Sequence, residues 1–351
     1  MPTIHDVAQR AGVSSATVSH TINGTRFVDP ATQDRVRAAI AEVAYRPNFF
    51  ARGLRRRESR TLGLVIPDNT NPFFAEMARV IEDAGFASGY SVVLCNSDRS
   101  ASKEALYVDL LLAKQVDGII LASANAQPNI IDQIRDAKAP VVLIPGELGD
   151  FDVDILMTDD FAAGQIAAEH LVALGHTHIA CITGPRSTSA SAGRVAGFKA
   201  VLADAGTALV ASARGDFRAE RGRDAMAELL DSAPDFTAVF AANDLTAIGA
   251  LQTLHLRGLR VPDDVSLMGF DNMQLSDLVT PRLTTIAHSL PEIGPRTIEL
   301  LLNRISNPGA PPVQLLLPAT LVVRESTAQP LVPTAAIPNL AGEPAERRMP
   351  A

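Results

Sequence analysis

Polar and aromatic side chains recur at the ends of apolar, strand-like runs in this 351-residue sequence, and their types suit the binding of a small polar molecule. Guanidinium, carboxylate and amide groups can take paired hydroxyls, and an aromatic ring can cover the C–H face of the same ligand. Because ligands of open parallel sheets bind beyond the carboxyl ends of the strands, we expect these side chains to line one cleft. They are Asn71, Phe73, Phe74, Asp159, Arg194, Phe217, Asn243 and Asp271.

Each of these residues could instead have an ordinary structural role. Arg194 could pair with Asp271 or with a surface acid, and Phe73 could belong to the core. Asn243 could cap the helix that follows it. The cleft is favoured because several such side chains fall at the same kind of position.

The sequence contains no recognisable catalytic constellation. It has no phosphate-binding glycine loop and no nucleophile elbow, and His170, His176 and His178 fall in a helix end and the turn after it. We therefore expect no enzyme, no metal site and no cofactor. An enzyme that acts on a sugar is kept as an alternative, as is a binding protein of the periplasmic type.

The chain from residue 61 onward alternates apolar runs with helical stretches, which predicts a doubly wound parallel sheet. Because residues 61–327 are too many for one such sheet, we expect two similar subdomains with a cleft between them. The expected strands are Leu62–Ile66, Val92–Cys95, Gly118–Leu121, Val141–Ile144, Ile155–Thr158, Ile179–Thr183, Ala238–Ala241 and Ser266–Phe270. Expected helices include Phe74–Ala87, Phe161–Leu174 and Arg194–Ala205, the last of which Arg194 opens.

The first 47 residues predict a small all-α unit. Thr3 can cap a helix that runs to Ala11, and Gly12 then allows a tight turn. Ser14 or Ser15 can cap a second helix that runs to Asn23, and Asp29-Pro30 can start a third. Two short helices joined by a glycine turn and braced by a third form a helix-turn-helix, whose second helix places its N-terminal residues against base edges.

Charge is divided unevenly along the chain. The formal net charge is −8, but residues 1–60 hold ten arginines and five acids, a net charge of +5, which leaves −13 for the rest. A basic head on an acidic body is typical of a protein that touches nucleic-acid phosphates with one end only. Arg55, Arg56 and Arg57 follow Leu54 in residues 48–60, which fits either a solvated basic linker or, as we favour, a hinge segment that lies in the minor groove.

No apolar stretch of about 18 residues and no signal peptide occurs, so we expect a cytoplasmic protein with no membrane partner. Cys95 and Cys181 lie in apolar runs and are expected to be core thiols. Residues 328–351 lack a hydrophobic period and are expected to be disordered. They show no leucine heptads, so we expect no added tetramerisation segment.

Taken in order, the N-terminal residues closely resemble the DNA-binding head and hinge of the lactose-repressor (LacI) family, with the head nearest to its purine-repressor branch. Many other members carry arginine where this chain has His20. The resemblance continues over residues 3–327. The runs that carry it are Thr3–Ala8, Ala11–Ser14, Ala16–His20, Ile22–Gly24, Tyr45–Asn48, Ala51–Leu54, Leu267–Asp271, Pro281–Ile286 and Val323–Ser326.

The resemblance implies a transcription repressor that binds palindromic operator DNA as a two-fold homodimer and is controlled allosterically by a small-molecule effector. It further implies that Leu54 is a wedge between base steps at the operator centre, and that the strand-end residues above hold the effector. The expected DNA-binding residues are Thr3, Ser14, Ser15, Ala16, Thr17, His20, Asn23, Arg26, Asn48, Ala51, Leu54 and Arg55.

The effector class has two interpretations. The head favours the purine branch, which would make the ligand a purine or nucleoside co-repressor. Relatives that take purines have a more basic loop where this chain has Thr188 and Ala190, which suit a base poorly. We give the pocket more weight because it alone meets the ligand, and we therefore expect a small sugar or a sugar-derived effector.

Overall fold

The computed structural model describes residues 2–45, 58–123, 128–145, 152–186, 188–232 and 235–331. The chain divides into two compact units, Met1–Ser59 and Arg60–Ala351. The expected hinge residues Asn48, Ala51, Leu54 and Arg55 lie outside the described residues, and so does the tail from residue 332.

The N-terminal unit contains the three expected helices. Thr3 caps the first through a capping box, in which Asp6 N–H donates to the Thr3 hydroxyl and Thr3 N–H donates to the Asp6 carboxylate. Gly12 ends that helix at φ +66°, a left-handed conformation that glycine adopts without strain. Ser14 caps the second helix, and Asp29 caps the third. The helices are α1 (Ile4–Ala11), α2 (Ser15–Asn23) and α3 (Pro30–Glu42).

Fully or nearly buried apolar side chains hold these three helices together, and they are Val7, Ala8, Ala11, Val18, Val36 and Ala39. They come from all three helices, so the unit has a core of its own. That core fixes α2 in place, with its N-terminal turn at the surface.

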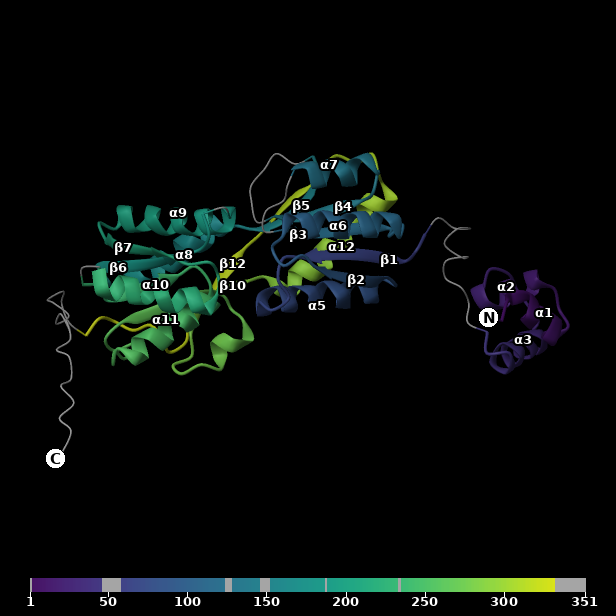
Figure 1. Cartoon of the computed structure of the whole chain (residues 1–351), viewed down its shortest axis with the longest axis horizontal. Coiled ribbons are helices and arrows are strands. Elements are labelled where there is room, and N and C mark those ends of the chain that lie inside the picture. Colours follow the sequence, from purple (N-terminus) through teal and green to yellow (C-terminus); the bar gives the residue numbers. More distant parts are fainter. Residues whose placement is uncertain are drawn as a thin grey trace, which may run out of the picture. The chain divides into compact units, whose positions relative to one another are not determined.

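The body contains two six-stranded sheets among the described residues, in the orders β11-β5-β4-β3-β1-β2 and β12-β10-β9-β8-β6-β7 (Figure 1). The first sheet is β1 (Thr61–Ile66), β2 (Ser91–Asn96), β3 (Gly118–Ser123), β4 (Val141–Pro145), β5 (Asp154–Thr158) and β11 (Gln314–Leu317). The second is β6 (His178–Thr183), β7 (Ala208–Arg214), β8 (Ala238–Ala241), β9 (Ser266–Asp271), β10 (Thr284–His288) and β12 (Ala319–Val322).

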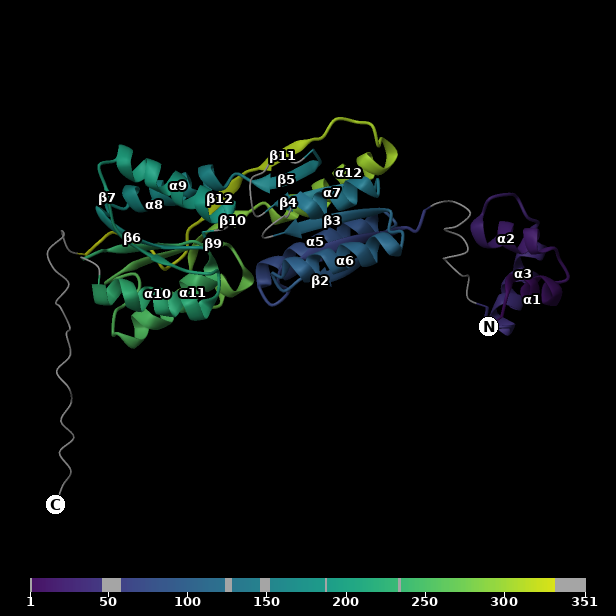
Figure 2. The ribbon, with the colours of Figure 1, turned by 45° about the horizontal axis from the view of Figure 1, so that its top comes forward.

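Helices cover both faces of each sheet, as expected for a doubly wound fold. In the first sheet α5 (Pro72–Ala87) and α12 (Leu290–Ser306) pack on one face, and α6 (Ala101–Ala113) and α7 (Pro128–Asp136) on the other. In the second sheet α8 (Asp160–Ala173) and α9 (Ser189–Asp204) lie opposite α10 (Ala219–Ser232) and α11 (Asp244–Leu256) (Figure 2). The chain crosses between the sheets after β5, after β10 and after β11.

Two details differ from the sequence-based expectation. The helix expected to open at Arg194 begins at Ser189, so Arg194 lies inside it, because the small residues before Arg194 continue the helix rather than form a loop. Strand β12 pairs antiparallel with β10 at the edge of an otherwise parallel sheet. Within the described part of the chain, no helix is both long and apolar enough to cross a membrane.

Candidate functional site

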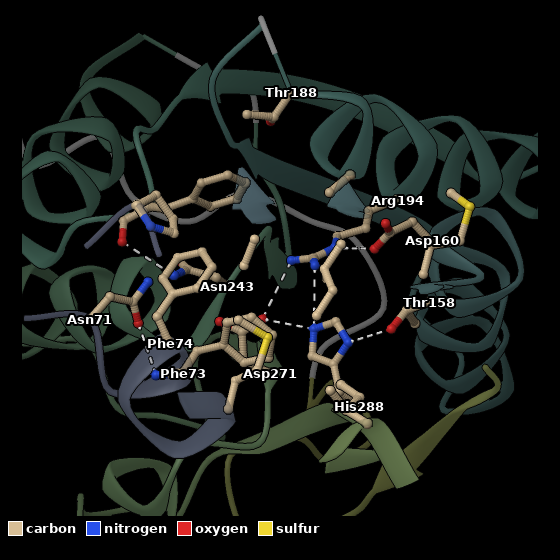
Figure 3. A pocket seen from close by; sticks show the side chains of 18 of the residues that line it. Asn71, Phe73, Phe74, Thr158, Asp160, Thr188, Arg194, Asn243, Asp271 and His288 are labelled. Atoms are coloured by element: carbon tan, nitrogen blue, oxygen red, sulfur yellow. Dashed lines mark hydrogen bonds and ion pairs between the residues drawn. The ribbon is translucent and has the colours of Figure 1, made fainter. Parts of the chain in front are cut away.

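A cavity of about 210 Å³ opens between the two sheets of the body, at the carboxyl ends of their strands (Figure 3). Both sheets supply its walls, as expected for a ligand site in this kind of fold. The side chains that matter for its chemistry are Asn71, Phe73, Phe74, Arg99, Thr158, Asp160, Thr188, Arg194, Phe217, Asn243, Asp271 and His288.

Arg194 is the centre of the polar wall. Its Nε donates to Asp160 Oδ1 at 2.8 Å, and its Nη1 donates to the carbonyl of Ala242 at 2.7 Å. Nη1 also lies 3.6 Å from Asp271 Oδ1, and the guanidinium carbon lies 3.6 Å above the ring of Phe270. Only 7% of the side chain is exposed, so water solvates its positive charge poorly, and the two carboxylates balance that charge instead. The guanidinium therefore has a fixed position and orientation.

His288 joins the two halves of the cleft. Its Nδ1 lies 2.8 Å from the hydroxyl of Thr158, at the end of β5 in the first sheet, and its Nε2 lies 3.2 Å from Asp271 Oδ1 in the second sheet. The ring of Phe73 packs on the imidazole with a centroid separation of 4.6 Å. Arg194 Nη2 also lies 3.4 Å from Nε2. Nε2 can donate to Asp271 when it carries the proton or accept from Arg194 when it does not, whereas the Thr158 hydroxyl suits either ring tautomer.

The backbone at Asp271 adopts an unusual conformation, with φ +112° at this residue and +56° at Asn272. Such conformations cost energy and persist where surrounding contacts hold them, commonly at functional sites. Asp244, which is fully buried, supplies two of those contacts, since its carboxylate accepts from Met273 N–H and from the Thr285 hydroxyl. Burial, together with the nearby Asp271 carboxylate, raises the pKa of Asp244 well above its usual value.

Two asparagines and a phenylalanine complete the rim. Asn71 caps α5 by accepting from Phe73 N–H, and Asn243 caps α11 by accepting from Thr246 N–H. The Asn243 amide also donates to the carbonyl of Phe217, which holds the loop that carries this ring. A Cβ at Gly184 would come within 2.4 Å of the Phe217 ring, so a glycine is needed there for the ring to occupy its place.

Arg99 approaches the cavity from the loop between β2 and α6. Its Nη1 donates to the carbonyl of Asp216 in the second half of the body, and its Nε lies 3.6 Å from Asp68 Oδ2 in the first half. This side chain therefore connects the two halves beside Phe217. Two arginines and two aspartates line the cavity, so its formal charges balance.

Seven of the eight residues predicted for the cleft line the cavity, and Asp159 is the exception. The Asp159 carboxylate instead accepts from Ala162 N–H and caps α8, while its neighbours Thr158 and Asp160 face the cavity. A strand-to-helix turn directs successive side chains differently, and the sequence does not show which one points inward.

The sequence analysis missed Asp160, His288 and Arg99. His288 ends an apolar run, Thr284–His288, and could have been found by treating that run as one more strand. Arg99 offers no such pattern, because its place depends on how a loop folds across the cleft. Arg194 and Asn243 also have the structural roles that the sequence offered as alternatives. Arg194 pairs with aspartates and Asn243 caps α11, and both side chains line the cavity as well.

In the N-terminal unit, the predicted DNA-contacting residues of α2 divide into exposed and engaged side chains. Ala16 is exposed on the first turn. The Ser14 hydroxyl accepts from Thr17 N–H and contacts the Thr17 hydroxyl, whereas His20 Nδ1 lies 2.8 Å from the hydroxyl of Thr25. These contacts keep the second helix and the turn after it in a defined shape, with a polar surface around Ala16.

The remaining predicted head residues lie near the ends of the helices. Asn23, the last residue of α2, donates to the carbonyl of Ser19 and is partly buried. Arg26 and Thr3 are exposed, and Thr3 uses its hydroxyl in the capping box of α1. No cluster of His, Cys, Asp and Glu suited to a metal ion occurs within the ranges that the structure describes.

Each of the two units matches a known protein family. Residues 3–48 match the model for bacterial regulatory proteins of the lacI family, and residues 59–325 match the model for periplasmic binding proteins and the sugar binding domain of the LacI family. The ribose operon repressor of Escherichia coli (strain K12) is 37% identical over 329 residues, which cover 93% of this chain and 100% of that protein.

Two solved structures are also similar. A lac repressor dimer bound to operator and the anti-inducer ONPF has a TM-score of 0.85 and 29% identity over 93% of this chain and 99% of that one. A LacI family regulator from Enterococcus faecium with bound ribose has a TM-score of 0.71 and 33% identity over 77% of this chain and 99% of that one. The family match and the identity over nearly the whole chain show that this protein belongs to the LacI family of bacterial transcriptional regulators.

Proposed function

We propose that this protein is a transcription repressor whose affinity for a palindromic operator is set by a neutral sugar, or a close sugar derivative, bound in the cavity around Arg194. The observation that carries the proposal is a set of buried or half-buried, oriented polar groups that are only partly used within the described chain. Toward the described residues, Asp271 and Asp160 each use only Oδ1, which leaves Oδ2 of both as an acceptor, and Asn71 Nδ2 donates to none of them.

These groups suit a neutral, hydroxyl-rich ligand. A hydroxyl can donate to a carboxylate oxygen and accept from an amide, so one sugar can use both kinds of group. The aromatic rings of Phe73 and Phe217 suit its C–H faces. The balanced charges of the cavity favour a ligand without net charge, and about 210 Å³ suits a monosaccharide rather than a larger ligand.

The proposed DNA-binding residues are Thr3 at the start of α1, the residues of α2 and its two flanks, and residues of the hinge. They are Thr3, Ser14, Ser15, Ala16, Thr17, His20, Asn23, Arg26, Asn48, Ala51, Leu54 and Arg55. Exposure of Ala16 on the first turn of α2 supports a contact with base edges in the major groove. The net charge of +5 on residues 1–60 supports contact with phosphates. We place the hinge at residues 48–60, between a head of residues 1–47 and a body of residues 61–327.

A two-fold homodimer follows from the same proposal, because a palindromic operator presents two equal half-sites. Exposed apolar side chains on the body support it. Val93 and Leu94 lie on β2, at the edge of the first sheet, and Leu106 and Leu110 lie on α6. Partly exposed apolar groups of this kind are typical of surfaces that another chain covers.

Control by the effector is a linkage between the cavity and the operator-binding surface. His288 and Arg99 each contact both halves of the body, so a ligand in the cavity acts on the relative position of the halves. A coupling of about 1–3 kcal/mol, which is usual for allostery, changes operator affinity by about five- to 150-fold.

A thermal-shift screen of the purified protein against sugars, sugar acids and purines tests the effector class. A neutral monosaccharide is expected to raise the unfolding midpoint, and stabilisation by purines alone would contradict the proposal. An operator selected from random DNA is then titrated by fluorescence anisotropy with and without that sugar. A change in operator affinity is expected, and sugar binding with no such change would exclude the allosteric role.

A further inference from the structure

A second hollow, separate from the effector cavity, lies between α9 and the carboxyl ends of β6 and β7. Its volume is about 570 Å³. The neighbouring strand β7 is the edge strand of the second sheet, so this hollow opens at the margin of the body. We call it the edge groove, and it is lined by Thr183, Gly184, Pro185, Arg186, Ser191, Ala192, Val195, Ala196, Lys199, Ser212, Ala213 and Arg214.

Three cations face this groove and have no counter-ion among the described residues. Arg186 follows the end of β6, Lys199 lies on α9 and Arg214 ends β7, and all three are exposed. None of them takes part in an ion pair or a side-chain hydrogen bond with the described chain, and no acidic residue lines the groove.

This arrangement stands out against the rest of the body. Residues 61–351 carry a formal charge of −13, and most of their described Lys and Arg side chains are paired with a carboxylate, as Arg221 is with Glu228 and Arg260 with Asp264. Three unpaired cations around one hollow repel one another, and an anion that binds between them removes that repulsion.

Hydroxyl groups and small side chains complete a surface that an anion can approach closely. Ala192 and Ala196 lie on the face of α9 that also carries Lys199, and both are exposed. The buried Ser191 hydroxyl accepts from Gly184 N–H at 2.9 Å, which leaves its proton for a ligand oxygen. Ser212 on β7 adds a second, exposed hydroxyl.

We infer that the edge groove binds the phosphate group of a small anion, either inorganic phosphate or a phosphorylated metabolite. Guanidinium groups match phosphate oxygens with paired N–H donors, and an ammonium adds a point charge. The volume exceeds what phosphate alone fills, so the groove has room for an organic portion beyond it.

The groove shares a wall with the effector cavity. Pro185 lines both hollows, Arg186 and Ser191 face the groove, and Thr188 and Ala190 face the cavity. An anion in the groove therefore touches the segment that forms part of the effector site. Binding at one site then acts on the other, and any such coupling is reciprocal.

Isothermal titration calorimetry of the full chain at low ionic strength tests the inference with inorganic phosphate, glucose 6-phosphate and glucose as probes. Phosphate-dependent binding is expected, and it should weaken as salt is added. In Lys199→Ala and in Arg214→Ala the affinity for phosphate or glucose 6-phosphate should fall about tenfold, because each change removes a charge-assisted contact. All three cations are exposed, so these variants are expected to fold, and thermal unfolding checks that they do.

Arg223→Ala is the matched control, because Arg223 is an exposed arginine of the same body that is likewise without an ion pair to the described residues but lies on α10, outside the groove. It should leave phosphate affinity unchanged. Tighter binding of glucose 6-phosphate than of phosphate assigns the groove to organic phosphates, and equal binding assigns it to the free ion. The inference fails if the wild-type protein binds neither probe, if Lys199→Ala and Arg214→Ala bind them as the wild type does, or if these residues affect only the binding of DNA.

Discussion

Replacing Asp271 by asparagine tests the effector site most directly. The variant keeps the size of the side chain and one oxygen acceptor but removes the negative charge that lies 3.6 Å from Arg194 and 3.2 Å from His288. The protein is expected to fold, because Arg194 retains its contacts with Asp160 at 2.8 Å and with the carbonyl of Ala242 at 2.7 Å.

The size of the effect follows from the burial of the site. Only 5% of the Asp271 side chain is exposed, so a hydroxyl that donates to its carboxylate is poorly replaced by water. A hydrogen bond to a charged group contributes about 1.5–3 kcal/mol. Since about 1.4 kcal/mol corresponds to a factor of ten, the affinity for the effector should fall about tenfold to a hundredfold.

Calorimetric titration with the sugar that gives the largest shift in the thermal screen measures this loss. The matched control is Asp159→Asn, which removes a carboxylate that lies outside the cavity although its sequence neighbours Thr158 and Asp160 line it. Asparagine caps a helix about as well as aspartate, since its Oδ1 can still accept from Ala162 N–H, so this change should alter stability little and leave sugar affinity unchanged. Wild-type sugar affinity in Asp271→Asn, or an equal loss in both variants, would refute the assignment of Asp271.

Three further predictions concern other parts of the chain. Asp154→Ala should lower the free energy of unfolding by about 3–5 kcal/mol in urea titrations, because it leaves the largely buried Arg304, whose Nε and Nη2 both bond the Asp154 carboxylate, without its partner; a loss below about 1 kcal/mol would contradict this. The pKa of Asp244 is higher in the folded than in the unfolded state, so between these two values the folded state binds more protons. The free energy of unfolding should therefore fall as pH rises from the usual aspartate range through the raised pKa. The pH profile of thermal unfolding should therefore be flatter in Asp244→Asn, and an unchanged profile would show that this carboxyl does not titrate as described. Leu54→Ala should weaken operator binding in anisotropy titrations while sugar binding stays the same, and equal operator affinity would exclude the wedge role.

The overall architecture was predictable because it depends on local patterns. Alternating apolar runs and helical stretches predicted both subdomains, and the order of caps and glycine at Thr3, Gly12 and Asp29 predicted the head. These features are set by backbone propensity and side-chain periodicity over a few residues, so distant contacts do not change them.

Most residues that matter for the chemistry of the cavity were also predictable, because ligands of parallel sheets bind beyond the carboxyl ends of the strands. The distances between these residues were not. Because the carboxyl ends of parallel strands meet at one edge, Asn243 and Asp271 had to come close together once the strands were assigned. Residue types at those ends were enough to suggest a polar ligand.

Tertiary structure alone decided which side chains face that ligand. Asp160 and not Asp159 lines the cavity, because the direction of each side chain depends on how the strand-to-helix turn packs. His288 and Arg99 reach it through contacts with Thr158 and Asp216, which are far from them in sequence. The sequence also did not show that the cations of the edge groove have no counter-ion among the described residues, because whether a charge has a partner depends on residues that only folding brings near.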